Sequence, residues 1–140
     1  MASRNVMETV ARRFHEHQTQ DPLSYLAELV HEDAEMTLLI NHLQPLRGRQ
    51  AIMAALERGR EADYHRAHIE RDEWLDDSVL FLSGQARYAH QDGGISNSRV
   101  WWLDEFRDGL LWRVRAFRTE AEARAAYEAS VAENVDWDSS

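Results

Sequence analysis

Two extended segments joined by a short polar turn constrain the fold more than any other feature of this sequence. Ser98 to Phe106 and Leu110 to Phe117 are rich in apolar and aromatic side chains, and they flank Arg107-Asp108-Gly109, a strong hairpin connection. Tyr64 to Trp74 and Val79 to Tyr88 precede them, with turn residues between. Four strands in direct succession predict an antiparallel meander.

Helical patterns lie outside this block of strands. The sequence predicts four helices, with these limits: Asn5, as N-cap, to about His17; Asp21, as N-cap, through Val30; Arg49 to about Arg58, with Gly59 as its stop; and a short last helix from Thr119. One early strand, Glu35 to Ile40, lies between the second and third helices. Helices grouped apart from a meander indicate an α+β domain, which we place at residues 1–132. The acidic tail, residues 133–140, is expected to fray.

The composition excludes several classes of function. A formal net charge of −9 disfavours nucleic-acid binding, because phosphates repel a mostly acidic surface. The absence of cysteine excludes disulfides, a thiol nucleophile and a cysteine zinc site. The chain has neither an apolar run of about 18 residues nor a signal-peptide pattern at its start, so no membrane span is expected. We therefore expect a soluble cytoplasmic protein.

Three short motifs in a fixed order carry a resemblance to a known family. They are His31-Glu32-Asp33-Ala34, then Leu46-Arg47-Gly48-Arg49-Gln50-Ala51-Ile52, then Phe106-Arg107-Asp108-Gly109 with Val114-Arg115-Ala116-Phe117. Together they resemble the SnoaL-like branch of the nuclear transport factor 2-like superfamily, which includes polyketide cyclases and ketosteroid isomerases. The resemblance implies a cone-shaped, cystatin-like α+β fold. Its parts are a strongly curved, mostly antiparallel sheet, three helices in the N-terminal half and a short C-terminal helix, which together enclose a pocket.

The same resemblance indicates which side chains of the last hairpin face the pocket. With Val114 and Ala116 inward, strand alternation gives this inward set: Val100, Trp102, Asp104 and Phe106, beside Trp112. The register assumes a three-residue loop, whereas a two-residue Asp-Gly turn would pair Asp104 with Arg113.

Asp104 is the first candidate catalytic residue. A lone carboxylate desolvated among aromatic side chains is suited to general acid or base chemistry. The alternative is a structural ion pair between Asp104 and an arginine of the sheet, with these candidates: Arg99, Arg113 and Arg115. His42, after the inward positions of the first strand, is the second candidate, because a histidine beside Asp104 suits proton transfer; a solvated loop histidine is the alternative.

The remaining predicted site residues are substrate-binding side chains. They are Trp102, Phe106, Trp112, Val114, Leu38, Met53, Tyr25 and Tyr64. No metal site is expected, because His65 and His68 point to opposite faces of one strand. The ketosteroid isomerase machinery is not retained, since its general base falls on about Leu38 and its oxyanion-hole acid on about Trp102.

Two functions from different classes remain open. The first is a cofactor-independent acid–base enzyme acting on an apolar carbonyl or polyketide-like compound. The second is a non-catalytic ligand-binding or accessory domain. In either case the partners expected are a small apolar organic ligand and a second copy of the chain. The homodimer would form through the convex sheet face, where Trp101, Leu103 and Phe117 make an apolar patch.

Overall fold

The computed structural model describes residues 3–16, 23–37, 45–61, 65–89 and 95–139. In chain order its elements are α1 (Arg4–His15), α2 (Leu23–Ala27), β1 (Val30–Thr37), β2 (Leu46–Arg47), α3 (Arg49–Glu61), β3 (His65–Trp74), β4 (Val79–Ala89), β5 (Ile95–Arg107), β6 (Leu110–Phe117) and α4 (Glu120–Ser139). The predicted α+β class is confirmed. In the described part of the chain, no helix is long and apolar enough to cross a membrane.

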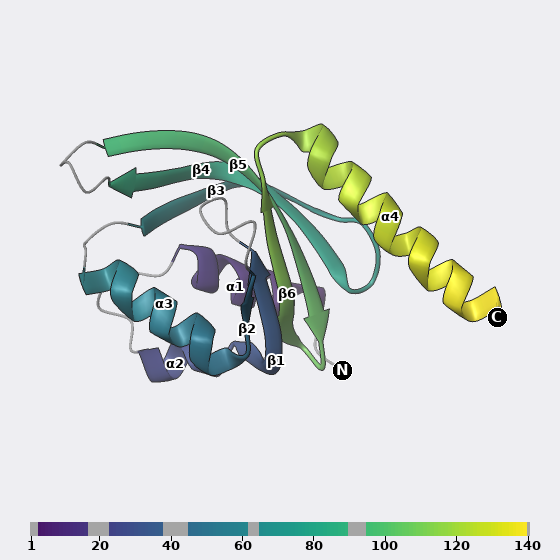
Figure 1. Cartoon of the computed structure of the whole chain (residues 1–140), viewed down its shortest axis with the longest axis horizontal. Helices are drawn as coiled ribbons and strands as arrows, with labels where there is room; N and C mark the ends of the chain where they lie inside the picture. Colours follow the sequence, from purple (N-terminus) through teal and green to yellow (C-terminus); the bar gives the residue numbers. More distant parts are fainter. Residues whose placement is uncertain (1–2, 17–22, 38–44, 62–64, 90–94, 140) are drawn as a thin grey trace.

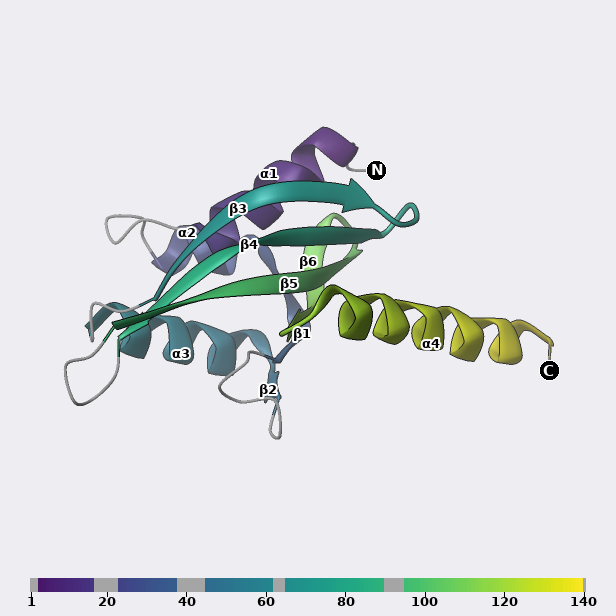
Figure 2. The same ribbon diagram turned by 90° about the horizontal axis from the view of Figure 1, so that it is seen from above.

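The six strands form one curved sheet in the order β2-β1-β6-β5-β4-β3. Strands β3 to β6 pair antiparallel in succession, which confirms the predicted meander, and among the described strand pairs the β1–β6 contact is the parallel one. Figure 1 shows α1, α2 and α3 inside the bend of the sheet and α4 on its other side. Figure 2 shows α4 running beyond the sheet toward the C-terminus.

The β5–β6 hairpin differs from the loop expected from the sequence. Its turn has two residues, Asp108 and Gly109, with φ of 56° and 78°, as a type I′ turn requires. A bulge then leaves Trp112 unpaired, because Glu105 lies opposite Arg113 while Phe106 lies opposite Leu111. Beyond the bulge Asp104 lies opposite Val114, whereas the three-residue loop would have placed Trp112 opposite it. The register therefore differs from the expected one, but Asp104 keeps the expected inward facing.

Two apolar cores lie on the two faces of the sheet. The inner core is formed by α1, α3 and the concave face, and it includes Phe14, Ile52 and Trp102. The outer core joins α4 to the convex face, where Ala123 of α4 packs in one cluster with Leu103. The adjacent tryptophans therefore separate as strand alternation predicts, with Trp102 in the inner core and Trp101 against the outer one.

Helix α4 is longer than the short helix expected, and it continues through Ser139 past the predicted domain limit. It packs on the same patch, Trp101, Leu103 and Phe117, that was expected to form a dimer. Its start is as predicted, because the Thr119 hydroxyl accepts a hydrogen bond from the N–H of Glu122 at 3.1 Å. The apolar patch is thus covered within one chain.

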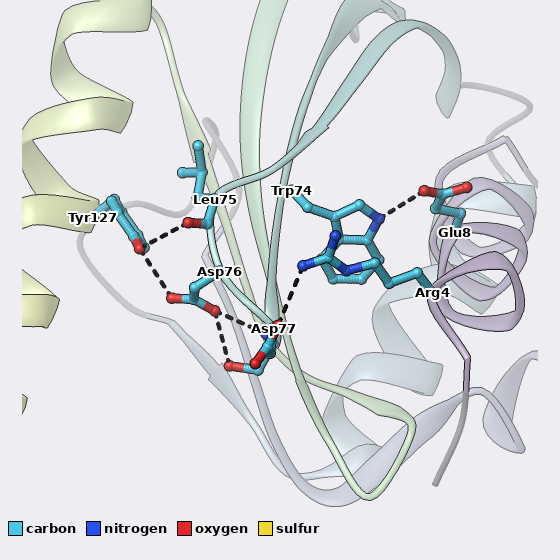
Figure 3. Close-up of polar contacts among 8 residues, drawn as sticks. Arg4, Glu8, Trp74, Leu75, Asp76, Asp77 and Tyr127 are labelled. Carbon is cyan, nitrogen blue, oxygen red and sulfur yellow. Dashed lines mark hydrogen bonds and ion pairs between the residues drawn. The ribbon is translucent and has the colours of Figure 1, made fainter.

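The β3–β4 turn is held from both sides by helices. The hydroxyl of Tyr127 on α4 lies 3.0 Å from the Asp76 carboxylate and 3.3 Å from the Leu75 carbonyl, and burial of the hydroxyl raises the pKa of Tyr127 (Figure 3). On the other side, Arg4 of α1 forms a 3.2 Å ion pair with Asp77. The turn therefore links the two helix layers through polar contacts.

Other helix limits also differ from those expected. The N-cap of α1 is Ser3 in place of Asn5, since the Ser3 hydroxyl accepts the N–H of Val6 at 3.2 Å. Helix α3 continues through Gly59 to Glu61. The early strand begins at Val30, five residues before the expected start, and its predicted end falls outside the described residues.

Candidate functional site

Asp104 lies at the centre of the concave sheet face and is fully buried. β5 lies between β4 and β6, and the register places Leu80 and Val114 directly beside Asp104. Trp102 and Phe106 flank it along β5 on the same face, because side chains alternate along a strand. All four neighbours belong to the inner apolar core, so the carboxylate lies in a desolvated environment.

His15, the last helical residue of α1, is the polar partner of Asp104. Its Nε2 lies 2.7 Å from Asp104 Oδ2, and the histidine is 6 % exposed. The imidazole is held between aromatic rings, with ring centroids 5.5 Å from Phe14, edge to face, and 4.9 Å from Trp102. The ring therefore has a fixed position against the carboxylate, as acid–base chemistry requires.

The second oxygen of Asp104, Oδ1, has no hydrogen-bond partner among the described residues, although it is buried. An unsatisfied buried acceptor costs about 1–3 kcal/mol. With its proton on Nε2, His15 donates to Oδ2, and the lone pairs of Oδ1 remain available. The pair can therefore accept a proton or a hydrogen bond at Oδ1 while His15 stabilises the charge.

The arginines that were the alternative partners of Asp104 bind other carboxylates. Arg113 and Arg115 both contact Glu105 on the convex face. Arg99 lies 3.0 Å from Glu70. The acid is therefore paired with a histidine of α1 and not with the arginines considered from the sequence.

The structure brings several predicted site residues together with Asp104. Trp102, Phe106 and Val114 lie in the same buried cluster, and Met53 of α3 packs against that cluster. Tyr25 is half-buried on α2. Three predicted site residues lie outside the described ones or have no described side chain: His42, Leu38 and Tyr64.

Trp112 is placed differently from its expected position beside Asp104. The bulge removes it from the inward series, and Leu111 takes the buried position in the inner core. Arg107 lies 3.8 Å from the Trp112 ring centroid and Arg113 lies 5.6 Å from it. Trp112 therefore makes cation–π contacts with these two arginines.

His15 was assigned no role from the sequence, although the helix carried a signal for it. Val6, Val10 and Phe14 recur at helical spacing in the sequence, which predicts them as the buried stripe of α1, but Val6 is 53 % exposed. The observed stripe is rotated and contains these residues: Met7, Val10, Ala11, Phe14 and His15. A stripe through Met7 and Ala11 continues four residues later at His15. Among the described residues, no group of three histidine or acidic side chains could hold a metal ion.

No protein-family model and no curated protein matches the sequence. Solved structures do match. One is the epoxide hydrolase/cyclase-like enzyme SalBIII of pyran ring formation in the polyether salinomycin, with a TM-score of 0.71, 10 % identity, and coverage of 86 % of this chain and 96 % of that one. Another is a candidate polyketide cyclase from Xanthomonas campestris, with a TM-score of 0.64, 17 % identity, and coverage of 89 % and 98 %.

A third match is an NTF2-like protein from Cytophaga hutchinsonii, with a TM-score of 0.64, 11 % identity, and coverage of 82 % of this chain and 97 % of that one. At these identities the similarity concerns the fold, and the fold is the one that the three sequence motifs implied. The chain therefore has the fold of the nuclear transport factor 2-like superfamily and is structurally similar to its SnoaL-like and polyketide cyclase members.

Proposed function

We propose that this protein binds a small apolar carbonyl or polyketide-like compound and acts on it as a cofactor-independent acid–base enzyme. Asp104 and His15 would be the proton-transfer pair. The observation that supports this is the buried Asp104 carboxylate, which has one oxygen bonded to His15 and the other without a described partner. His42 was the partner expected from the sequence, and His15 takes that role in this proposal.

The proposed chemistry is a proton shuttle at Oδ1 of Asp104. Oδ1 takes a proton from the carbon next to the substrate carbonyl, and the electron pair of that C–H bond moves into the enolate. His15 keeps its hydrogen bond to Oδ2 and so stabilises the ionised carboxylate before the transfer. The protonated acid then returns the proton to another atom of the substrate, which is the balance of an isomerisation or a cyclisation.

A specific observation favours a second candidate, a ligand-binding domain without catalysis. In the described part of the chain, His15 and Asp104 are the buried polar residues of the inner core, and every other buried member is apolar. A ligand that reaches this core would meet mainly apolar side chains, whether or not it reacts. We include a cytoplasmic location in either proposal, since the composition lacks cysteine.

Hydrogen–deuterium exchange into an apolar ketone such as 2-tetralone, followed by NMR in D2O, tests the enzyme proposal. We expect the wild-type protein to accelerate exchange at the carbon next to the carbonyl. Asp104→Asn is expected to lower this rate by about 10²–10⁴-fold, the range of general acid–base catalysis. Ser83→Ala is the matched control, because Ser83 is a buried polar residue of β4 outside the inner core.

The outcomes separate the two candidates. Exchange that Asp104→Asn does not slow would contradict the catalytic role of Asp104. Ketone binding by the wild type without any acceleration would support the ligand-binding domain, and a ketone panel that neither binds nor exchanges would contradict both.

We further propose that the convex face forms a homodimer beside α4. A groove of about 620 Å³ lies there, lined by Glu70, Arg71, Asp72, Glu73, Phe81, Ser83, Arg99, Trp101, Glu120 and Arg124. Its charges are mixed, and such a surface can complement its own copy across a two-fold axis. Light scattering at micromolar concentration is expected to give twice the chain mass, and a monomer mass would contradict the dimer.

A further inference from the structure

Four charged residues at four-residue spacing hold α1 against β3 and the turn that follows it. They are Arg4, Glu8, Arg12 and Glu16, and this row borders the buried stripe that ends at His15. Arg4 contacts Asp77 and Arg12 contacts Asp72, each at 3.2 Å and with partly or fully exposed side chains. Exposed ion pairs of this kind contribute little to stability. They do not by themselves fix the position of the helix.

The two glutamates of the row make shorter and less exposed contacts. Glu8 accepts a hydrogen bond from the indole Nε1 of Trp74 at 2.6 Å (Figure 3). Glu16 accepts the backbone N–H of Ile69 at 2.6 Å. Hydrogen bonds to a carboxylate are shorter and stronger than those between neutral groups. The glutamates therefore hold α1 at two points along β3, one near the middle of the helix and one at its C-cap.

Glu16 lies at the C-terminal end of α1, directly beside the candidate site. It is the C-cap residue of α1, its own N–H donating to the Arg12 carbonyl at 2.8 Å, and it directly follows His15. Its carboxylate accepts the hydrogen bond from the N–H of Ile69. At Ile69 a bulge interrupts the pairing of the edge strand β3 with β4. The bulged strand therefore presents its backbone N–H to the last turn of α1, one residue from the imidazole that meets Asp104.

We propose that Glu16 is a positioning residue for the His15–Asp104 pair. Its carboxylate ties the last turn of α1 to the β3 bulge and so sets the distance of His15 Nε2 from Asp104. The catalytic significance of the Glu16–Ile69 hydrogen bond rests on the proposed function, whereas the geometry of that bond does not. The contact of His68 Nδ1 with the same carboxylate at 3.3 Å is largely exposed and is secondary.

NMR of protein labelled with ¹⁵N-histidine tests this proposal without any substrate. The His15 Nε2–H signal is assigned by its loss in His15→Gln, and we expect it to exchange slowly with water in the wild type. Glu16→Ala should make its exchange roughly tenfold faster, as expected for the loss of one charge-assisted hydrogen bond. Glu16→Gln should largely retain the protection, because the amide oxygen still accepts the Ile69 N–H.

Glu8→Ala is the matched control, since Glu8 belongs to the same row and also binds β3. It should leave the His15 signal unchanged even if it lowers thermal stability. An unchanged signal in Glu16→Ala overturns the proposal, and so does an equal loss in Glu8→Ala, which would mean that general docking of α1 is what matters. If Glu16→Ala does not fold, the comparison of Glu16→Asp with Glu8→Asp decides in the same way.

Ketone exchange measured on the same variants keeps the two proposals distinguishable. If the wild type is active, Glu16→Ala should lower kcat with KM nearly unchanged, because the substrate contacts are retained. A wild type without activity but with a Glu16-dependent His15 signal would remove the proposed function and leave the positioning role standing.

Discussion

Replacing His15 by leucine is expected to lower the free energy of unfolding by about 3–5 kcal/mol, although leucine is apolar and fills much of the same space. The imidazole is the described hydrogen-bond partner of Asp104, whose other oxygen has none. The variant would therefore bury a carboxyl group with no partner at all. Chemical denaturation at pH 7 measures the change.

The double variant His15→Leu/Asp104→Leu shows whether the loss belongs to the pair. Replacing a buried pair by apolar residues of similar size is often neutral or stabilising by about 1–4 kcal/mol. We therefore expect the double variant to recover most of the stability that His15→Leu loses. Met7→Leu is the control, because it changes a buried residue of α1 while conserving volume, and should cost less than about 1.5 kcal/mol. Additive losses in the double variant would show that the two side chains are not energetically coupled.

A more stable double variant would also say why the pair is present. A fold selected for stability alone has no reason to keep a carboxylate and an imidazole in its inner core. Residues that reduce stability at the centre of a concave face are expected where they serve binding or catalysis. The stability measurement would therefore support the proposed function independently of any substrate.

The position of Asp104 was predictable from the sequence because strands have a short and strict period. With Val114 inward and the hairpin register assumed from the family resemblance, alternation places Trp102 and Asp104 on the same inner face of the neighbouring strand. The pairing that produces this facing was not predictable. The Asp108–Gly109 turn is a common two-residue hairpin, but nothing in the local sequence marks Trp112 as the bulged residue.

The partner of Asp104 was not predictable in the same way, because the apolar residues of this helix are compatible with two different buried faces. Both Val6 and Met7 are apolar, and choosing Val6 turned the expected buried face away from His15. The covering of the outer face was not predictable for a different reason. The apolar patch around Trp101 was recognised, but the sequence does not say whether a second copy or the C-terminal helix covers it, and α4 does so.

Gly84→Ala is expected to destabilise the protein by about 3 kcal/mol, through steric overlap and not through helix or strand preference. Gly84 lies on β4 opposite Ile69, beside the bulge in β3. A Cβ at this position would lie 2.0 Å from the carbonyl oxygen of His68 and 2.9 Å from its carbonyl carbon. Both are backbone atoms, so β3 itself would have to move.

That movement would reach the candidate site, because the carbonyl of His68 and the N–H of Ile69 belong to the same peptide group, and Glu16 binds that N–H. Gly84→Ala should therefore also speed exchange of the His15 Nε2–H. Gly48→Ala is the control: its Cβ meets no atom within 4 Å, and its φ of 90° costs a residue with a side chain only about 1–2 kcal/mol. Thermal and chemical denaturation of the two variants measure the difference. If Gly84→Ala proves no less stable than Gly48→Ala, the close approach of β3 to β4 at this bulge is not a constraint on the fold.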